Sequence, residues 1–106
     1  MKVFISMPMK SKSVEQVLIE RDRIFEYIKK KLPEAELINS VLKDADKDIA
    51  SGGDDKGVWY LGKSIQLLSE ADIVFFVNNW ADFRGCSIER DVAEAYGKIC
   101  VDLSIK

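Results

Sequence analysis

The sequence predicts an α/β fold, namely a small Rossmann-like, doubly wound parallel sheet of about four strands with helices on both faces. Three observations support this fold, as a single domain over residues 1–106. Short apolar segments alternate along the chain with longer amphipathic ones. The segment Asp72–Val77 (DIVFFV) is continuously apolar after its first residue, as in strands that a sheet buries on both faces. The order strand, helix, strand, loop, helix, strand, helix, strand favours parallel pairing through right-handed crossovers.

The first third of the chain predicts a strand followed by a helix. Lys2–Ser6 (KVFIS) is a short segment rich in β-branched and aromatic residues, and Pro8 ends it. Ser13, with Gln16 three residues later, forms the capping-box pattern that begins a helix, and Pro33 ends this helix. The apolar residues at helical spacing between these ends are Val14, Val17, Leu18, Ile24, Phe25, Ile28 and Leu32.

The middle of the chain predicts a weaker strand at Glu36–Val41 (ELINSV), a polar loop at Lys43–Lys56 and a helix over Gly57–Ser69. This helix includes GVWYLGKS at Gly57–Ser64, which matches the phosphate-loop pattern G-x-x-x-x-G-K-[ST]. A phosphate loop needs a preceding strand and a glycine-rich backbone that wraps the phosphates. Because no strand precedes Gly57 and the variable positions hold bulky residues, we interpret the match as the start of a helix.

The last third predicts the strand Asp72–Val77, a loop at Asn78–Arg84, a helix over Ser87–Tyr96 that Gly97 ends, and a strand at Ile99–Leu103. In doubly wound sheets, ligands bind outside the carboxyl ends of the strands, near the point where the strand order reverses. The segments that follow the predicted strands there are Ser6–Ser11, Ser40–Asp44 and Asn78–Gly85.

Composition excludes several kinds of chemistry. The chain contains no histidine, so Ser-His-Asp and Cys-His catalytic sites and His-ligated zinc are excluded. Asp44, Asp46 and Asp48 match the opening of a calcium loop, but Ile49 and Asp55 occupy the positions of its glycine and its glutamate. We therefore expect neither a metal nor another cofactor.

Charge and hydropathy bound the partners and the compartment. The net charge of -2 gives no basic surface for a nucleic-acid backbone. No apolar segment reaches membrane-spanning length, and residues 1–10 lack the apolar stretch of a secretory signal. We expect a cytoplasmic protein that binds a small molecule, with Cys86 and Cys100 as free thiols.

The segment Trp80–Lys98 (WADFRGCSIERDVAEAYGK) contains the strongest candidates for a site. Glu89 falls in the first turn of the predicted helix, where the helix dipole favours the ionised carboxylate. Such a carboxylate can attack C1 of a sugar or stabilise an oxocarbenium ion. On the preceding loop, Asp82 would bond to a base or supply its proton, and Trp80 would stack on it. Two structural alternatives stay open, namely that Glu89 only complements the dipole and that Trp80 is a core or interface residue.

Four sequence blocks indicate a family. They are FISMPM at Phe4–Met9, IERDRIF at Ile19–Phe25, YLGKSIQLLSEADIVFF at Tyr60–Phe76 and the most specific one, W-x-D-x-R-G-C-x-I-E-x-x-x-A-x-x-Y-G at Trp80–Gly97. On these blocks, which cover nearly the whole chain, it resembles the nucleoside 2-deoxyribosyltransferase-like superfamily, in particular its short bacterial and phage members.

The resemblance implies a small Rossmann-like sheet and the cleavage or exchange of the N-glycosidic bond of deoxynucleosides or deoxynucleotides. It implies Glu89 as the nucleophile and Asp82 as the residue that assists at the base. The family commonly carries an Asp eight residues before Asp72, where this chain has Ser64, and a glycine near the ligand after the first strand, where it has Met7. Family members also build sites across subunits, which implies a dimer or larger homo-oligomer.

The leading hypothesis is an enzyme that acts on the N-glycosidic bond of a deoxynucleoside or its 5′-monophosphate without a cofactor. In it, Ser64 would orient the substrate and Met7 would lie beside the sugar or phosphate. The alternative, favoured by the residues found at these two positions, is a non-catalytic pocket for a nucleotide or a nucleotide-derived signal. The expected walls of the base are Trp80 with Trp59 or Tyr60, and the expected phosphate contacts are Ser6, Arg84 and Gly85.

Overall fold

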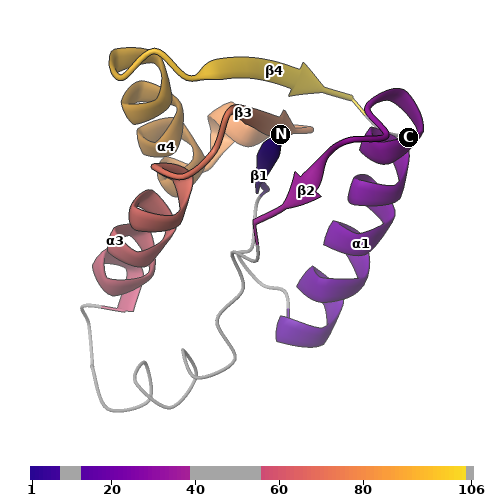
Figure 1. Cartoon of the computed structure of the whole chain (residues 1–106). Helices are drawn as coiled ribbons and strands as arrows, with labels where there is room; N and C mark the ends of the chain where they lie inside the picture. Colours follow the sequence, from indigo (N-terminus) through magenta and orange to yellow (C-terminus); the bar gives the residue numbers. More distant parts are fainter. Residues whose placement is uncertain (8–12, 39–55, 105–106) are drawn as a thin grey trace.

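The computed structural model describes residues 1–7, 13–38 and 56–104, which form parallel strands and helices in alternation (Figure 1). The predicted Pro8 strand end and the acidic Asp44–Asp48 pattern lie outside the described residues. The elements are β1 (Lys2–Ser6), α1 (Val14–Lys31), β2 (Glu36–Leu37), α3 (Lys56–Leu68), β3 (Ile73–Val77), the 3₁₀ helix η2 (Trp80–Asp82), α4 (Arg84–Ala95) and β4 (Ile99–Leu103).

The four strands form one parallel sheet in the order β2-β1-β3-β4. The chain first passes from β1 to β2 on one side and then crosses to β3 on the other side of β1. The strand order therefore reverses between β1 and β3, where Val3 pairs with Ile73 and Ser6 pairs with Phe76. This arrangement confirms the predicted doubly wound fold, and we call the side of the sheet where the strands end its carboxyl edge.

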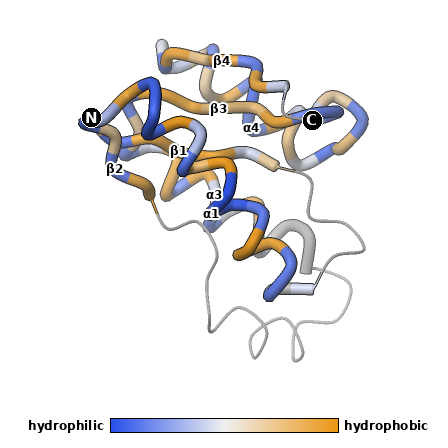
Figure 2. The backbone as a smooth tube through the Cα atoms, turned by 90° about the vertical axis from the view of Figure 1, so that its right-hand side faces the viewer, coloured by the Kyte–Doolittle hydropathy of each residue, from blue (hydrophilic) through white to orange (hydrophobic). Residues whose placement is uncertain are grey.

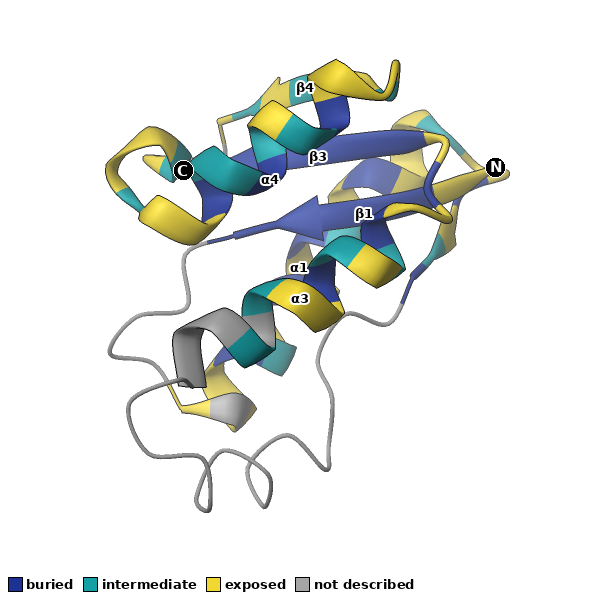
Figure 3. Cartoon of the chain, turned by 90° about the vertical axis from the view of Figure 1, so that its left-hand side faces the viewer, coloured by how far each residue is buried: buried dark blue, intermediate teal, exposed yellow. Residues whose placement is uncertain are grey.

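Helices cover both faces of the sheet, with α1 on one face and α3 and α4 side by side on the other (Figure 1). Side chains of a strand alternate between faces, so Val3 and Ile5 pack against α1, whereas Phe4 packs against α3 and α4. Figure 2 shows continuous hydrophobic colour along β3, and Figure 3 shows β1 and β3 buried. The two central strands are therefore the core of the molecule.

Local sequence signals locate several element ends as predicted. At the start of α1, the backbone N–H of Gln16 donates to Ser13 Oγ at 3.1 Å, and the Ser13 N–H donates to Gln16 Oε1 at 2.9 Å. The capping box is thereby confirmed. Gly97 follows α4 with a φ of 73°, the left-handed conformation for which glycine was predicted there.

Two element boundaries differ from the predictions by three or more residues. The strand β2 ends at Leu37, and its continuation to Val41 lies outside the described residues apart from Ile38, whose N–H donates to the carbonyl of Val3 at 2.9 Å. The helix α4 begins at Arg84, three residues before the predicted start at Ser87. The Ser87 N–H donates to the carbonyl of Phe83 at 3.0 Å, a helical bond that places Ser87 inside α4, and the extended Phe83 precedes the helix.

One sequence motif lies within the helix α3. Gly57–Ser64 lies wholly within α3, so the phosphate-loop match is a helical segment, as interpreted from the sequence. The predicted helix at Gly57–Ser69 is shifted by one residue, to Lys56–Leu68. Among the helices that the structure describes, none has the length and apolar character needed to cross a membrane.

Candidate functional site

A buried polar pair lies at the carboxyl edge of the sheet. The Ser6 hydroxyl, at the end of β1, donates a hydrogen bond to Glu89 Oε1 at 2.9 Å. The two residues are 83 positions apart in sequence, and their exposed fractions are 1% for Ser6 and 7% for Glu89. The fold therefore brings together two residues that the sequence predicts as site residues, beside the point where the strand order reverses.

Helical spacing explains why Glu89 faces the interior. The buried residues of α4 are Cys86, Glu89 and Ala93, which lie three and four positions apart on one side of the helix. Ala93 packs in the core with Phe4 and Val74. Because α4 begins at the carboxyl edge, Glu89 lies one turn closer to this edge than Ala93 does, at the rim of that core.

The ionisation of Glu89 differs from the expectation. Since α4 begins at Arg84, Glu89 lies in its second turn, so the prediction of a first-turn carboxylate was wrong. Burial raises the pKa of Glu89 to about 7, while the hydrogen bond from Ser6 lowers it. Near neutral pH the residue consequently exists in both the ionised and the protonated form, which suits a group that exchanges protons.

Cys86 is a third buried group beside this pair, and the sequence analysis did not assign it to the site. Burial raises the pKa of its thiol, a hydrogen bond with Ser6 lowers it, and the charge of Glu89 raises it. The thiol is therefore neutral near pH 7. Its position three residues before Glu89, on the same helix face, is the sequence signal that predicts this proximity.

Asp82, Arg84 and Gly85 lie at the exposed rim of the same edge. Asp82 ends η2, Arg84 begins α4, and all three residues are exposed. A Cβ atom added to Gly85 would meet no atom within 4 Å, so the fold does not require glycine there. Glu89 is buried and bonds to Ser6, whereas Asp82 faces solvent, so the two predicted catalytic carboxyls lie in different environments.

The remaining predicted contacts are divided among other parts of the molecule. Ser64 is buried on α3, which packs beside α4. Trp59 is half-buried on α3, with the Lys63 ammonium 5.8 Å from its ring centroid, and the side chain of Tyr60 lies outside the described residues. Met7 packs in the core on the α1 face, so its side chain lies on the other side of the sheet from Glu89.

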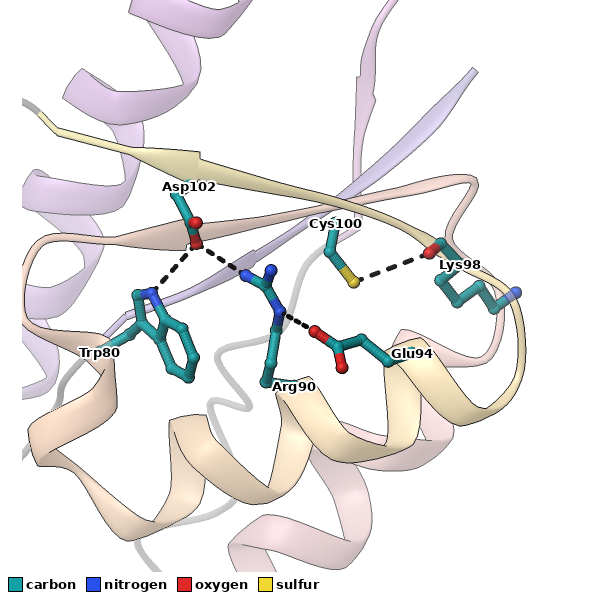
Figure 4. Close-up of polar contacts among 6 residues, drawn as sticks. All are labelled: Trp80, Arg90, Glu94, Lys98, Cys100 and Asp102. Atoms are coloured by element: carbon teal, nitrogen blue, oxygen red, sulfur yellow. Dashed lines mark hydrogen bonds and ion pairs between the residues drawn. The ribbon is translucent and has the colours of Figure 1, made fainter.

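Trp80 belongs to a network that we call the Arg90 network (Figure 4). Its indole N–H donates to Asp102 Oδ1 at 3.1 Å, and its ring lies 5.3 Å from that of Phe76. The Arg90 guanidinium lies 5.0 Å from the Trp80 ring and donates to Asp102 and Glu94, each at 2.6 Å. These contacts use the Trp80 ring within the protein, in line with the structural alternative for this residue.

The site offers a carboxyl group, a hydroxyl group and a thiol at a sheet edge. Among the described residues, no group of three or more Cys, Asp or Glu side chains is arranged to hold a metal ion. The chemistry available to the buried groups is proton exchange and nucleophilic attack by Glu89. Comparison of the chain with models of known protein families, with curated proteins and with solved structures found no match.

Proposed function

We propose that this protein cleaves or exchanges the N-glycosidic bond of a deoxynucleoside or its 5′-monophosphate, with Glu89 acting at C1 of the sugar. The observation that carries the proposal is the buried Glu89 carboxyl at the carboxyl edge, held by the Ser6 hydroxyl. Burying a carboxyl is costly, and groups with such perturbed ionisation concentrate at functional sites. The resemblance of the Trp80–Gly97 block to the deoxyribosyltransferase-like superfamily supports the same chemistry.

In the proposed reaction, the ionised Glu89 attacks C1 of the deoxyribose and forms an ester bond to it. The C1–N bond breaks, and its electron pair leaves with the base, which Asp82 protonates or hydrogen-bonds. Water then releases the sugar by hydrolysis, or a second base takes its place by transfer. Because only the ionised form attacks, the rate is expected to rise with pH as Glu89 loses its proton near pH 7.

The rim residues have supporting roles in this proposal. Arg84, with the backbone N–H groups at the start of α4, would hold a 5′-phosphate, since an arginine and a helix N-terminus both favour an anion. Ser64, buried on the neighbouring helix, would orient the sugar. Phe76 and Arg90 contact part of the Trp80 ring, and Trp80 would stack the remaining part on the base.

The test is a chromatographic assay for released or exchanged base. The protein is incubated with each deoxynucleoside and each 5′-monophosphate, with and without a second free base. We expect release by the wild type and none by Glu89→Gln, while Asp91→Asn, which changes an exposed carboxylate on the same helix, retains it. Release that persists in Glu89→Gln would remove Glu89 from the reaction, and no release from any substrate would contradict the enzymatic proposal.

Binding without turnover is the second candidate function. Two observations favour it, namely the partial protonation of Glu89 near pH 7 and the solvent exposure of Asp82. A protonated carboxyl donates a hydrogen bond, which suits recognition of an acceptor on a nucleotide. This candidate predicts that nucleotides raise the melting temperature without any base release.

Self-association and a reducing, cytoplasmic compartment complete the proposal. Tyr96 and Ile99, at the end of α4 and the start of β4, have exposed fractions of 79% and 58%, and a second copy would cover these apolar side chains. Cys86 and Cys100 are free thiols. We expect a dimer or larger assembly in light scattering, and a monomer mass independent of concentration would contradict it.

A further inference from the structure

We propose that Ser6 is a positioning residue for Glu89, whose hydroxyl fixes Oε1 and leaves Oε2 as the oxygen presented to a ligand. The geometry of this contact is independent of what the protein does, and only the use of Oε2 in a reaction rests on the function proposed above. Sequence reasoning expected Ser6 to hold a phosphate. Its hydroxyl proton is instead donated to Glu89.

The contact is fixed by the backbone on both sides. Ser6 ends the central strand β1 and pairs with Phe76 of β3, so its side chain is fixed on the face that α3 and α4 cover. Glu89 projects from α4, whose buried side packs against the same core through Ala93. Because Ser6 is only 1% exposed, solvent does not compete with Glu89 Oε1 for its hydroxyl proton.

The hydrogen bonds around Ser6 have a direction. A serine hydroxyl has one proton to donate, and Ser6 donates it to Glu89. Cys86 lies beside the same hydroxyl, since a hydrogen bond with Ser6 lowers the pKa of its thiol and the charge of Glu89 raises it. The single Ser6 proton therefore stabilises the negative charge on Glu89, the partner to which it is donated.

The elements packed against α4 present other titratable and charged groups, and their positions separate them from Glu89. Lys63 is exposed on α3, and Asp82 is exposed on η2. Asp102, on β4, bonds to Arg90 and Trp80. The groups that interact with Glu89 are Ser6 and Cys86. Among the side chains that the structure describes, the polar and charged groups on these elements include Ser6 on β1, Lys63 on α3, Asp82 on η2, Cys86, Arg84, Arg90, Asp91 and Glu94 on α4, and Lys98, Cys100 and Asp102 at β4.

The test is a ligand-free titration of Glu89 by carbon-13 NMR of its side-chain carboxyl, with the signal assigned by its loss in Glu89→Gln. We expect a wild-type midpoint near pH 7. Ser6→Ala removes a hydrogen bond to the ionised form, so its midpoint moves upward by roughly one pH unit. Ser87→Ala is the matched control, because Ser87 lies two residues before Glu89 but its hydroxyl bonds to the carbonyl of Ala81. This variant should leave the midpoint of Glu89 unchanged.

Two further variants separate positioning from general disruption. Ser6→Thr restores the hydroxyl and should return the midpoint toward that of the wild type. Cys86→Ala removes the neighbouring thiol and keeps the Ser6 hydroxyl, so it should move the midpoint less than Ser6→Ala does. Equal midpoints in the wild type and Ser6→Ala, or an equal shift in Cys86→Ala, would overturn the proposal.

A crystal structure of the wild type at pH 8 keeps the test independent of how well the variants fold. It is expected to show Ser6 Oγ within hydrogen-bond distance of one Glu89 oxygen, and a Ser6 side chain rotated away would overturn the proposal. The base-release assay fails or succeeds separately. A shifted midpoint without release counts against the proposed function only, and release with an unshifted midpoint counts against the role of Ser6 only.

Discussion

Glu89 and Arg90 are neighbours in α4, and the fold treats them in opposite ways. Glu89 faces the sheet, where burial raises its pKa to about 7. Arg90 faces β4 and η2, where its guanidinium lies 4.9 Å from the Phe76 ring centroid and donates to the carboxylates of Glu94 and Asp102 (Figure 4). Burial thus disfavours the charged form of Glu89, whereas the charge of the next residue, Arg90, has favourable partners.

The difference separates a polar cluster whose groups bond to one another within the protein from the one that we propose to be functional. The Arg90 network joins η2, α4 and β4 through ion pairs and ring contacts, so its chemistry is used within the protein. Glu89, by contrast, accepts a hydrogen bond from a neutral hydroxyl, at the edge where ligands of this fold class bind. A buried carboxyl that a protein does not neutralise with a cation is expected to carry a function.

The largest expected effect is a pH-dependent loss of stability due to Glu89. Its pKa rises from 4.5 to about 7 on folding, so the unfolded chain releases this proton first. The free energy of unfolding should therefore fall by about 1.4 kcal/mol per pH unit between these values, roughly 3 kcal/mol in total. Urea unfolding at pH 5 and pH 8 measures the fall, which Glu89→Gln should remove and the exposed-site control Asp91→Asn should keep. Parallel pH profiles for the wild type and Glu89→Gln would contradict the assignment.

An intermediate effect is expected from Arg90→Ala. The variant loses two cation–π contacts and the packing of the arginine stem against Phe76 and Trp80, so the free energy of unfolding should fall by about 1–2 kcal/mol. The ion pairs contribute little, because both carboxylate partners are exposed. The Arg90 guanidinium of the wild type is charged at both pH 5 and pH 8. Urea unfolding should therefore show the same loss of unfolding free energy in Arg90→Ala at the two pH values. A loss no larger than that of the exposed control Arg84→Ala would show that the network does not stabilise the fold.

The smallest expected effect is that of Glu94→Gln. This substitution breaks the ion pair between Glu94 and Arg90, four residues apart on α4, while the ring contacts of Arg90 remain. The side chain of Glu94 is 58% exposed, so we expect a loss of less than about 0.5 kcal/mol that 1 M NaCl removes. Thermal unfolding at low and high salt measures it. A salt-independent loss above this size would mean that the pair orients Arg90 toward Phe76.

The fold was predictable from local patterns. The continuous apolar segment before Asn78 identifies β3, and Ser13 with Gln16 locates the start of α1, because these signals depend on residues close in sequence. The start of α4 was predicted incorrectly for the same reason. A serine at position 87 is typical of a helix cap, whereas its N–H makes a helical bond to the carbonyl of Phe83 and its hydroxyl bonds to that of Ala81 in η2.

The buried pair of the candidate site was predictable in its residues and not in its geometry, and Cys86 beside it was missed. Glu89 and Ser6 were both identified, but their hydrogen bond spans 83 positions, and no local pattern reports such a distance. The roles of Arg90 and Asp102 depend on β4 returning beside β3, which places Asp102 next to residues far from it in sequence. The raised pKa of Glu89 follows from burial, a property of the assembled core.

The pairing of β1 with β3 also sets conditions for how this chain folds. The first and the third strands lie about 70 residues apart, and the Lys2 N–H even donates to the Asp72 carboxylate across this separation at 2.8 Å. The central contact of the sheet thus closes a long loop before much apolar surface is buried, which makes contact order high and folding comparatively slow. During synthesis, the apolar β1 segment has no pairing partner until β3 has been made. In the interval between the synthesis of the two strands, the chain is therefore most prone to aggregation and most dependent on chaperones.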